Sequence, residues 1–120
     1  MDQDKIFHNW LVSYFKEKFS QTYSEIDINF EGEQSNSFQG SYPDLILKSH
    51  GLVVGIVEIE TEKTISIERA AQWKTLSKLG VKLIIMVPDV LKKKVTELLW
   101  DEGIVQDISL GTYELKVTMP

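Results

Sequence analysis

Two short apolar segments separated by His50-Gly51 constrain the fold of this chain more than any other feature. Pro43 to Ser49 and Leu52 to Glu60 are each long enough for one strand. Glycine can take the positive φ that a tight hairpin turn requires. We therefore expect an antiparallel β-hairpin, in which the start of the first strand lies opposite the end of the second strand.

The segments around the hairpin predict helices and further strands. Apolar residues at helical spacing predict an amphipathic helix from Lys5 to Phe19, and Ser24 to Glu31 alternates as a strand does. After the hairpin, Ser66 is a suitable N-cap for a helix from Ile67 to Leu79. Val81 to Val87 is apolar enough for a strand buried on both faces.

The C-terminal part predicts one more helix and two short extended segments. The helix runs from Val90 to about Asp101 and is stopped by Gly103, and the extended segments are Ile104 to Leu110 and Thr112 to Thr118. The expected order is αβββαβαβ, and the helix before the buried strand acts as a crossover. This order predicts an α/β fold with a mixed central sheet flanked by helices.

Composition bounds the class of protein. The 120 residues have room for a single domain, residues 1–120, and the absence of cysteine excludes disulfides, zinc-thiolate sites and thiol nucleophiles. Only His8 and His50 are histidines, both expected in solvent, so any metal would be a hard cation with oxygen ligands. No apolar run approaches the ~20 residues that cross a bilayer. The acidic start, where a secretory signal is basic, predicts a cytoplasmic protein with no membrane association.

The formal net charge of −5 argues against a protein that coats nucleic acid through a general basic surface. The charge is unevenly distributed, however. Eight basic residues lie between Lys63 and Lys94, against only Glu68 and Asp89. This stretch is either a local anion-facing side or a set of solvated lysines on helix faces.

Three carboxylates are expected to converge at one end of the hairpin. Because side chains alternate across a strand, Glu58 and Glu60 share a face with Val54 and Ile56. Counted outward from the turn, Asp44 lies close to Glu58. Their mutual repulsion destabilises the fold unless a divalent cation or bound protons neutralise it. The alternatives are that these residues form a polar strand face or a strand-start turn.

This pattern resembles the PD-(D/E)xK phosphodiesterase superfamily, which includes restriction endonucleases and Holliday junction resolvases. The resemblance is carried by Pro43-Asp44 and Glu58-Ile59-Glu60, each on its own strand of a hairpin, and by an element order that matches the αβββαβ core of that family. It implies a restriction endonuclease-like fold. It also implies that Asp44 and Glu58 bind Mg²⁺ (or Mn²⁺), helped by the backbone carbonyl of Ile59.

Glu60 stands where the family usually has a lysine, as in the E-x-E variant of some restriction enzymes. The resemblance implies that Glu60 orients or deprotonates the attacking water. Lys74, on the following helix, is the candidate for the missing cation, and Lys63 is a weaker one. Many family members place a glutamine in that helix, which implies a role for Gln72. Some resolvases place an acid on the first helix, which makes Glu17 a further candidate ligand.

The resemblance implies a Mg²⁺-dependent endonuclease that hydrolyses DNA phosphodiester bonds, with nucleic acid as its partner. It also implies a homodimer, because such enzymes commonly pair subunits to cut two strands. Two alternatives stay open. One is a catalytically degenerate nuclease-fold module that binds nucleic acid or protein, which would also show Glu60 in place of lysine. The other is an unrelated small α/β domain whose carboxylates are only surface charge.

Overall fold

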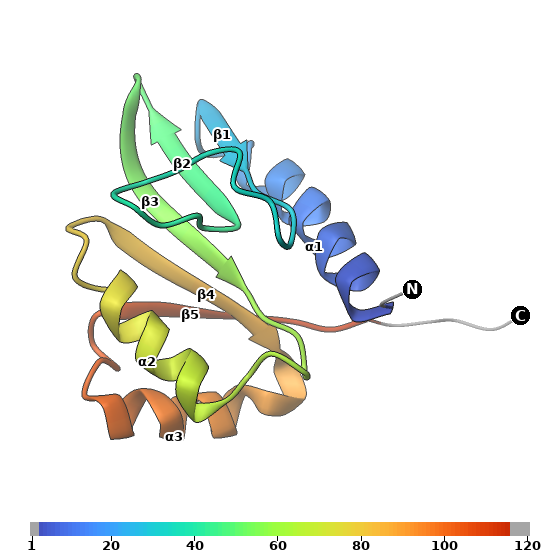
Figure 1. Cartoon of the computed structure of the whole chain (residues 1–120), viewed down its shortest axis with the longest axis vertical. Coiled ribbons are helices and arrows are strands. Elements are labelled where there is room, and N and C mark those ends of the chain that lie inside the picture. Colours follow the sequence, from blue (N-terminus) through green and yellow to red (C-terminus); the bar gives the residue numbers. More distant parts are fainter. Residues whose placement is uncertain (1–2, 116–120) are drawn as a thin grey trace, which may run out of the picture.

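A five-stranded mixed sheet forms the centre of the molecule, with α1 on one face and α2 and α3 on the other (Figure 1). The structure is a computed structural model and describes residues 3–115. Along the chain the elements are α1 (Gln3–Phe19), β1 (Glu25–Ile28), β2 (Leu45–Ser49), β3 (Leu52–Ile59), α2 (Ile67–Leu76), β4 (Lys82–Pro88), the 3-10 helix η1 (Asp89–Leu91), α3 (Lys92–Glu102) and β5 (Ile108–Tyr113).

The strands lie in the sheet in the order in which they occur in the chain. β1, β2 and β3 pair antiparallel, whereas β4 is parallel to β3 and β5 is parallel to β4. The parallel pairs need crossover connections, which α2 and α3 supply. The chain therefore has an α/β fold built on a mixed open sheet with three helices.

The predicted hairpin is present. His50 and Gly51 form its turn with φ values of 54° and 80°, the left-handed conformation that a two-residue hairpin turn favours. One detail differs from the expected alternation of side chains. The register shifts in the middle of the hairpin, so Val54 has no partner on β2 and is exposed, whereas Ile56 is fully buried. Beyond the bulge the alternation is regular, but every pair is shifted by one residue, so Leu45 pairs with Val57 instead of Ile56.

Each face of the sheet carries its own hydrophobic core. The core under α2 and α3 contains Ile85 and Val87 of β4, and the core under α1 contains Ile84 and Met86 of the same strand. The expectation that this strand is buried on both faces is therefore confirmed. None of the helices within residues 3–115 is long and apolar enough to cross a membrane.

Two other segments differ from expectation. α2 ends at Leu76, one turn before the predicted end. The two C-terminal extended segments are replaced by one strand, residues 108–113, that continues through Gly111. Residues 105–107 form a turn instead of extended chain, and residues 116–118 lie outside the described residues. A Cβ atom at Gly111 would lie 2.6 Å from the sulfur of Met86, so glycine lets β5 pass close to that side chain.

Gly103 ends α3 in the left-handed region with φ 74°, and its N–H donates to the carbonyl of Trp100. We expect Gly103→Ala to lower the free energy of unfolding by about 1 kcal/mol, because alanine is strained in this conformation. The added Cβ would meet no atom within 4 Å, so strain is the main cause. Gly103→Asn should lose less, since asparagine tolerates this conformation. Equal losses in urea denaturation would contradict this explanation.

Candidate active site

Asp44 and Glu58 face each other at the open end of the hairpin. Leu45 pairs with Val57, which places Asp44 one residue beyond the paired part of β2. The backbone N–H of Ile59 donates to Asp44 Oδ2 over 2.7 Å. The structure therefore brings Asp44 together with the strand end that carries Glu58. Counted from the turn alone, Asp44 would lie opposite Val57, and the register shift at Val54 moves it by one residue to lie opposite Glu58.

Glu58 is the most strongly perturbed acid of this site. Burial raises its pKa well above the ordinary value, and the negative charges of Asp44 and Glu60 raise it further. A hydrogen bond with the Asp44 side chain acts in the same direction, and the positive charge of Arg69 opposes the shift. The raised pKa favours the neutral form of Glu58, which lessens its repulsion from the neighbouring carboxylates.

The Glu60 carboxylate is built into the wall of the site, with only 1% of the residue exposed. Trp73 Nε1 donates to Oε2 over 3.0 Å, and Thr64 Oγ1 donates to Oε1 over 2.6 Å. Arg69 Nε lies 3.4 Å from Oε1. Burial raises the pKa of Glu60, while Arg69, Thr64 and Trp73 oppose that rise. Both oxygens thus already have protein partners.

Arg69 is the cation that α2 contributes to this site, beside Glu60. Its Nε also lies 3.4 Å from the carbonyl oxygen of Thr64, and its Nη1 lies 3.4 Å from Gln72 Oε1. In the sequence, Arg69 is one of eight basic residues between Lys63 and Lys94, and no motif singles it out. Helix phase was the available signal: Gln72 and Lys74 point about 200° apart on an α-helix, whereas Arg69 and Gln72 share a face. A helix that directs Gln72 to the site therefore directs Arg69 there too.

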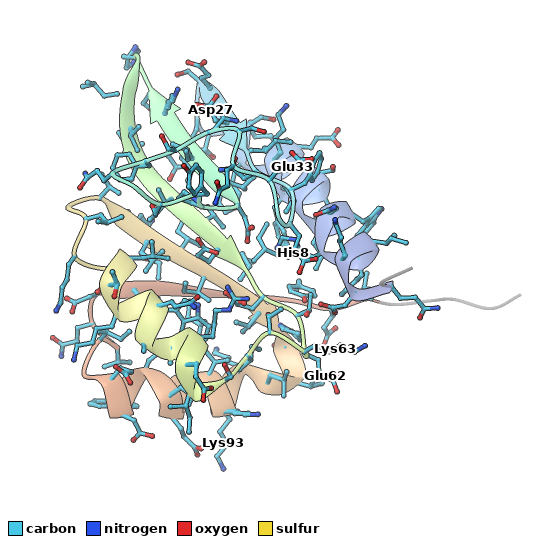
Figure 2. The ribbon with its side chains drawn as sticks, viewed as in Figure 1. His8, Asp27, Glu33, Glu62, Lys63 and Lys93 are labelled. Atoms are coloured by element: carbon cyan, nitrogen blue, oxygen red, sulfur yellow. The ribbon has the colours of Figure 1, made fainter. Side chains whose placement is uncertain are left out.

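Three other expected residues lie elsewhere. Lys74 lines neither of the two cavities that adjoin Glu58. Lys63 is exposed in the turn after β3, as Figure 2 shows. Glu17 is exposed near the end of α1, nine residues or ~13 Å along the helix axis from His8. The structure does not bring these three side chains to Asp44 and Glu58.

Two cavities adjoin Glu58, and both are also lined by Tyr42 and Arg69. The first, which we call the acidic cavity, has a volume of about 160 Å³ and includes Asp44 and His8 in its lining. The second, which we call the side cavity, has a volume of about 320 Å³ and includes residues of α2. The shared lining makes them two parts of one cleft.

His8 was expected in solvent, and this expectation is wrong. His8 lies on the buried stripe of α1 with Leu11, Val12 and Phe15, and Figure 2 shows it between α1 and the end of the hairpin. Its Nε2 lies 3.1 Å from Asp44 Oδ2. Burial lowers the pKa of His8, but the hydrogen bond and charge of Asp44 outweigh this effect, and the result is a rise to about 9. His50, in contrast, is exposed in its turn as expected.

The protein supplies only part of the ligand set that a magnesium ion needs. Within residues 3–115, no group of three or more His, Asp or Glu side chains is arranged to hold a metal ion. Mg²⁺, however, is commonly bound through one or two carboxylates, while water and substrate phosphate complete its coordination. Asp44 and Glu58 supply that minimal set, whereas the Glu60 oxygens are already engaged.

Comparison with models of known protein families finds no match, and no curated protein sequence matches the chain. Function is therefore inferred from the geometry of the cleft.

The pair of His8 and Asp44 makes stability depend on pH. The pKa of His8 is about 9 in the folded chain and about 6.5 in the unfolded chain. Because the folded-state pKa is the higher one, the stabilisation is complete below about pH 6.5 and is lost as pH rises through about 9. We expect the free energy of unfolding, measured by urea denaturation with a chelator present, to fall across this window. The raised pKa of Glu58 acts in the same direction.

His8→Gln should remove the histidine part of this pH dependence, and the exposed His50→Gln is the matched control that should retain it. An identical slope of stability against pH in the two variants would show that His8 is not its source.

Proposed function

We propose that this chain is a metal-dependent phosphodiesterase that cleaves DNA. The observation that carries the proposal is the meeting of the Asp44 and Glu58 carboxyl groups with the Arg69 guanidinium in one cleft. Two adjacent carboxylates suit a divalent cation, and a guanidinium suits a phosphate group. We further propose that the fold is restriction endonuclease-like, supported by the succession of α1, the antiparallel β1 to β3, the crossover α2 and the parallel β4.

Asp44 and Glu58 would hold Mg²⁺ or Mn²⁺, with the carbonyl of Ile59 as the expected backbone ligand. When bound, such an ion makes hydroxide available near neutral pH and polarises the phosphate. Arg69 would contact a phosphate oxygen and stabilise the negative charge that grows during attack. Its side chain is 35% exposed, so the guanidinium is accessible from the cleft.

We assign to Glu60 the role of positioning Arg69, in place of the water-orienting role expected from the sequence. Its oxygens already accept bonds from Trp73 and Thr64, and Oε1 lies beside Arg69 Nε. An acid at the family's lysine position therefore supplies a cation indirectly, by holding an arginine from α2. We therefore assign the cationic role to Arg69 in place of Lys74. Gln72 Oε1, near Arg69 Nη1, helps to hold the guanidinium in position.

One observation favours a second candidate, a nuclease-fold interaction module without catalysis. All three carboxylates have partners in the absence of a metal, namely His8 for Asp44, Asp44 for Glu58 and Arg69 for Glu60. A degenerate site would retain this arrangement as structure. The homodimer implied by the resemblance stays a prediction.

Mg²⁺ or Mn²⁺ should raise the melting temperature of the protein, because an ion that binds only the folded state stabilises it by mass action. Asp44→Asn should lose most of this increase, whereas Asp107→Asn, an exposed aspartate in the turn before β5, should retain it. Differential scanning fluorimetry measures both. Equal metal responses in the two variants would contradict a site at Asp44.

With Mn²⁺ present, the protein should nick or cleave circular plasmid, branched oligonucleotides or single strands. Glu58→Gln should lose this activity by about 10²-fold or more, whereas Glu68→Gln, on the exposed side of α2, should keep it. Metal-dependent stabilisation without cleavage of any of these substrates would favour the interaction module.

Arg69→Gln should lower the cleavage rate by about 10²-fold, the usual loss for one group that stabilises transition-state charge. The metal-induced increase in melting temperature should remain, because Asp44 and Glu58 are intact. Lys74→Gln on the same helix is the matched control and should cleave at the wild-type rate. A loss confined to Lys74→Gln would return the cationic role to Lys74.

A further inference from the structure

The side cavity is larger than the cavity that holds Asp44, and its lining beyond Glu58, Arg69 and Gln72 has no role in the proposed hydrolysis. Its volume is about 320 Å³, and the β1 to β2 loop, the end of β3 and α2 form its walls. Tyr42, Glu58 and Arg69 also line the acidic cavity. A ligand whose phosphate lies at Asp44 and Glu58 therefore has adjoining space for the next chemical group.

The loop wall of this cavity is held in place by hydrogen bonds. Asn29 Nδ2 donates to the carbonyls of Pro43 and Asn36 over 2.8 and 2.7 Å. Gln39 Nε2 donates to the carbonyl of Leu79 over 3.0 Å, which joins the loop to the chain just after α2. The cavity is thus formed before any ligand enters, which lowers the entropic cost of binding.

The lining suits a flat heterocycle. Tyr42 is 42% exposed and offers its ring at the edge of the cavity, and Leu76 and Trp73 give an apolar wall. The hydroxyls of Ser41 and Thr75 and the amide of Gln72 supply hydrogen-bonding groups in the same cavity. An aromatic ring beside a few polar groups is how many proteins bind an unpaired base.

We propose that the side cavity binds a nucleobase of single-stranded nucleic acid, next to the phosphate that occupies the acidic cavity. The inference rests on the proposed function, since the neighbouring phosphate fixes where the strand lies. Tyr42 stacks on the base, and Arg69 stands at the junction of base and phosphate.

Charge and geometry favour a single strand over a duplex. A base in a duplex is stacked and paired, so it enters a cavity only after it is flipped out, at a cost of a few kcal/mol. Duplex binding also depends on many lysine and arginine contacts to phosphates, and this chain has a net charge of −5. Stacking in a cavity with one nearby cation makes a smaller demand on surface charge.

The test measures binding separately from cleavage. A fluorescein-labelled oligothymidylate of about eight nucleotides, within the site sizes of ~4–16 nucleotides known for single-strand binders, is titrated with protein and followed by anisotropy. The titration is done in chelator and again with Ca²⁺. Tyr42→Ala should weaken binding by about tenfold, and Tyr42→Phe, which keeps the ring, should bind as the wild type does.

Tyr14→Ala is the matched control, because Tyr14 is also 42% exposed but lies on α1 and lines neither part of the cleft. It should leave binding unchanged. A strand whose bases are replaced by abasic sites should bind the wild-type protein as weakly as the normal strand binds Tyr42→Ala. This comparison uses the unaltered protein, so it does not depend on how the variant folds.

Absence of binding under both conditions overturns the proposal, as does equal binding by Tyr42→Ala and Tyr14→Ala. Tighter binding of a duplex of the same length also overturns it. Tyr42-dependent binding without cleavage would support the base site while refuting the phosphodiesterase. Cleavage that is indifferent to Tyr42 and to abasic sites would refute the base site and leave the phosphodiesterase standing.

Discussion

The buried Glu60 carboxylate joins the end of β3 to the rest of the molecule. Burying an ionised carboxylate is unfavourable unless donors and a cation compensate it, and here every compensating group comes from outside β3. The backbone of Glu60 is bonded as well. Its N–H donates to the carbonyl of Met86 in β4, and its carbonyl accepts from the hydroxyl of Tyr113 in β5. The groups bonded to this one residue are Thr64, Arg69, Trp73, Met86 and Tyr113. The position of α2 over the sheet, and with it the position of Arg69, follows from this set of contacts.

The charges of the cleft are balanced in pairs. His8 lies beside Asp44, Arg69 lies beside Glu60, and the raised pKa of Glu58 favours a proton between it and Asp44. Three acids at the end of one hairpin are therefore compatible with a stable fold. The same balance explains why carboxylates alone do not identify a metal site. The proposed phosphate chemistry rests instead on the Arg69 guanidinium, which lines the same cavity as Asp44 and Glu58.

Local chemistry was sufficient to predict the hairpin and the doubly buried strand, because turn residues and apolar runs specify them directly. The register counted from the turn brings Asp44 to the end of β3 but opposite Val57, and the bulge at Val54 shifts it by one residue to lie opposite Glu58. His8 was misplaced because it was judged by residue type instead of by its position on the buried stripe of α1. The bulge at Val54 depends on packing between strands, which no local pattern encodes. Arg69 was within reach of the sequence, since helix phase separates Lys74 from Gln72.

The β1 to β2 loop contains a short exposed stretch between two hydrogen-bonded residues, Asn29 and Asn36. The Asn29 side chain donates to the carbonyl of Asn36 and accepts from the N–H of Asn36. Residues 32–35, between these two asparagines, are exposed and include Glu33 (Figure 2). Extra residues inserted after Glu33 would extend the rim of the cleft without moving the Asn29 hydrogen bond that holds Pro43. Under the proposed function, loop length alone would then set how much of a nucleic acid strand the cleft covers, while Asp44, Glu58 and Arg69 keep their places.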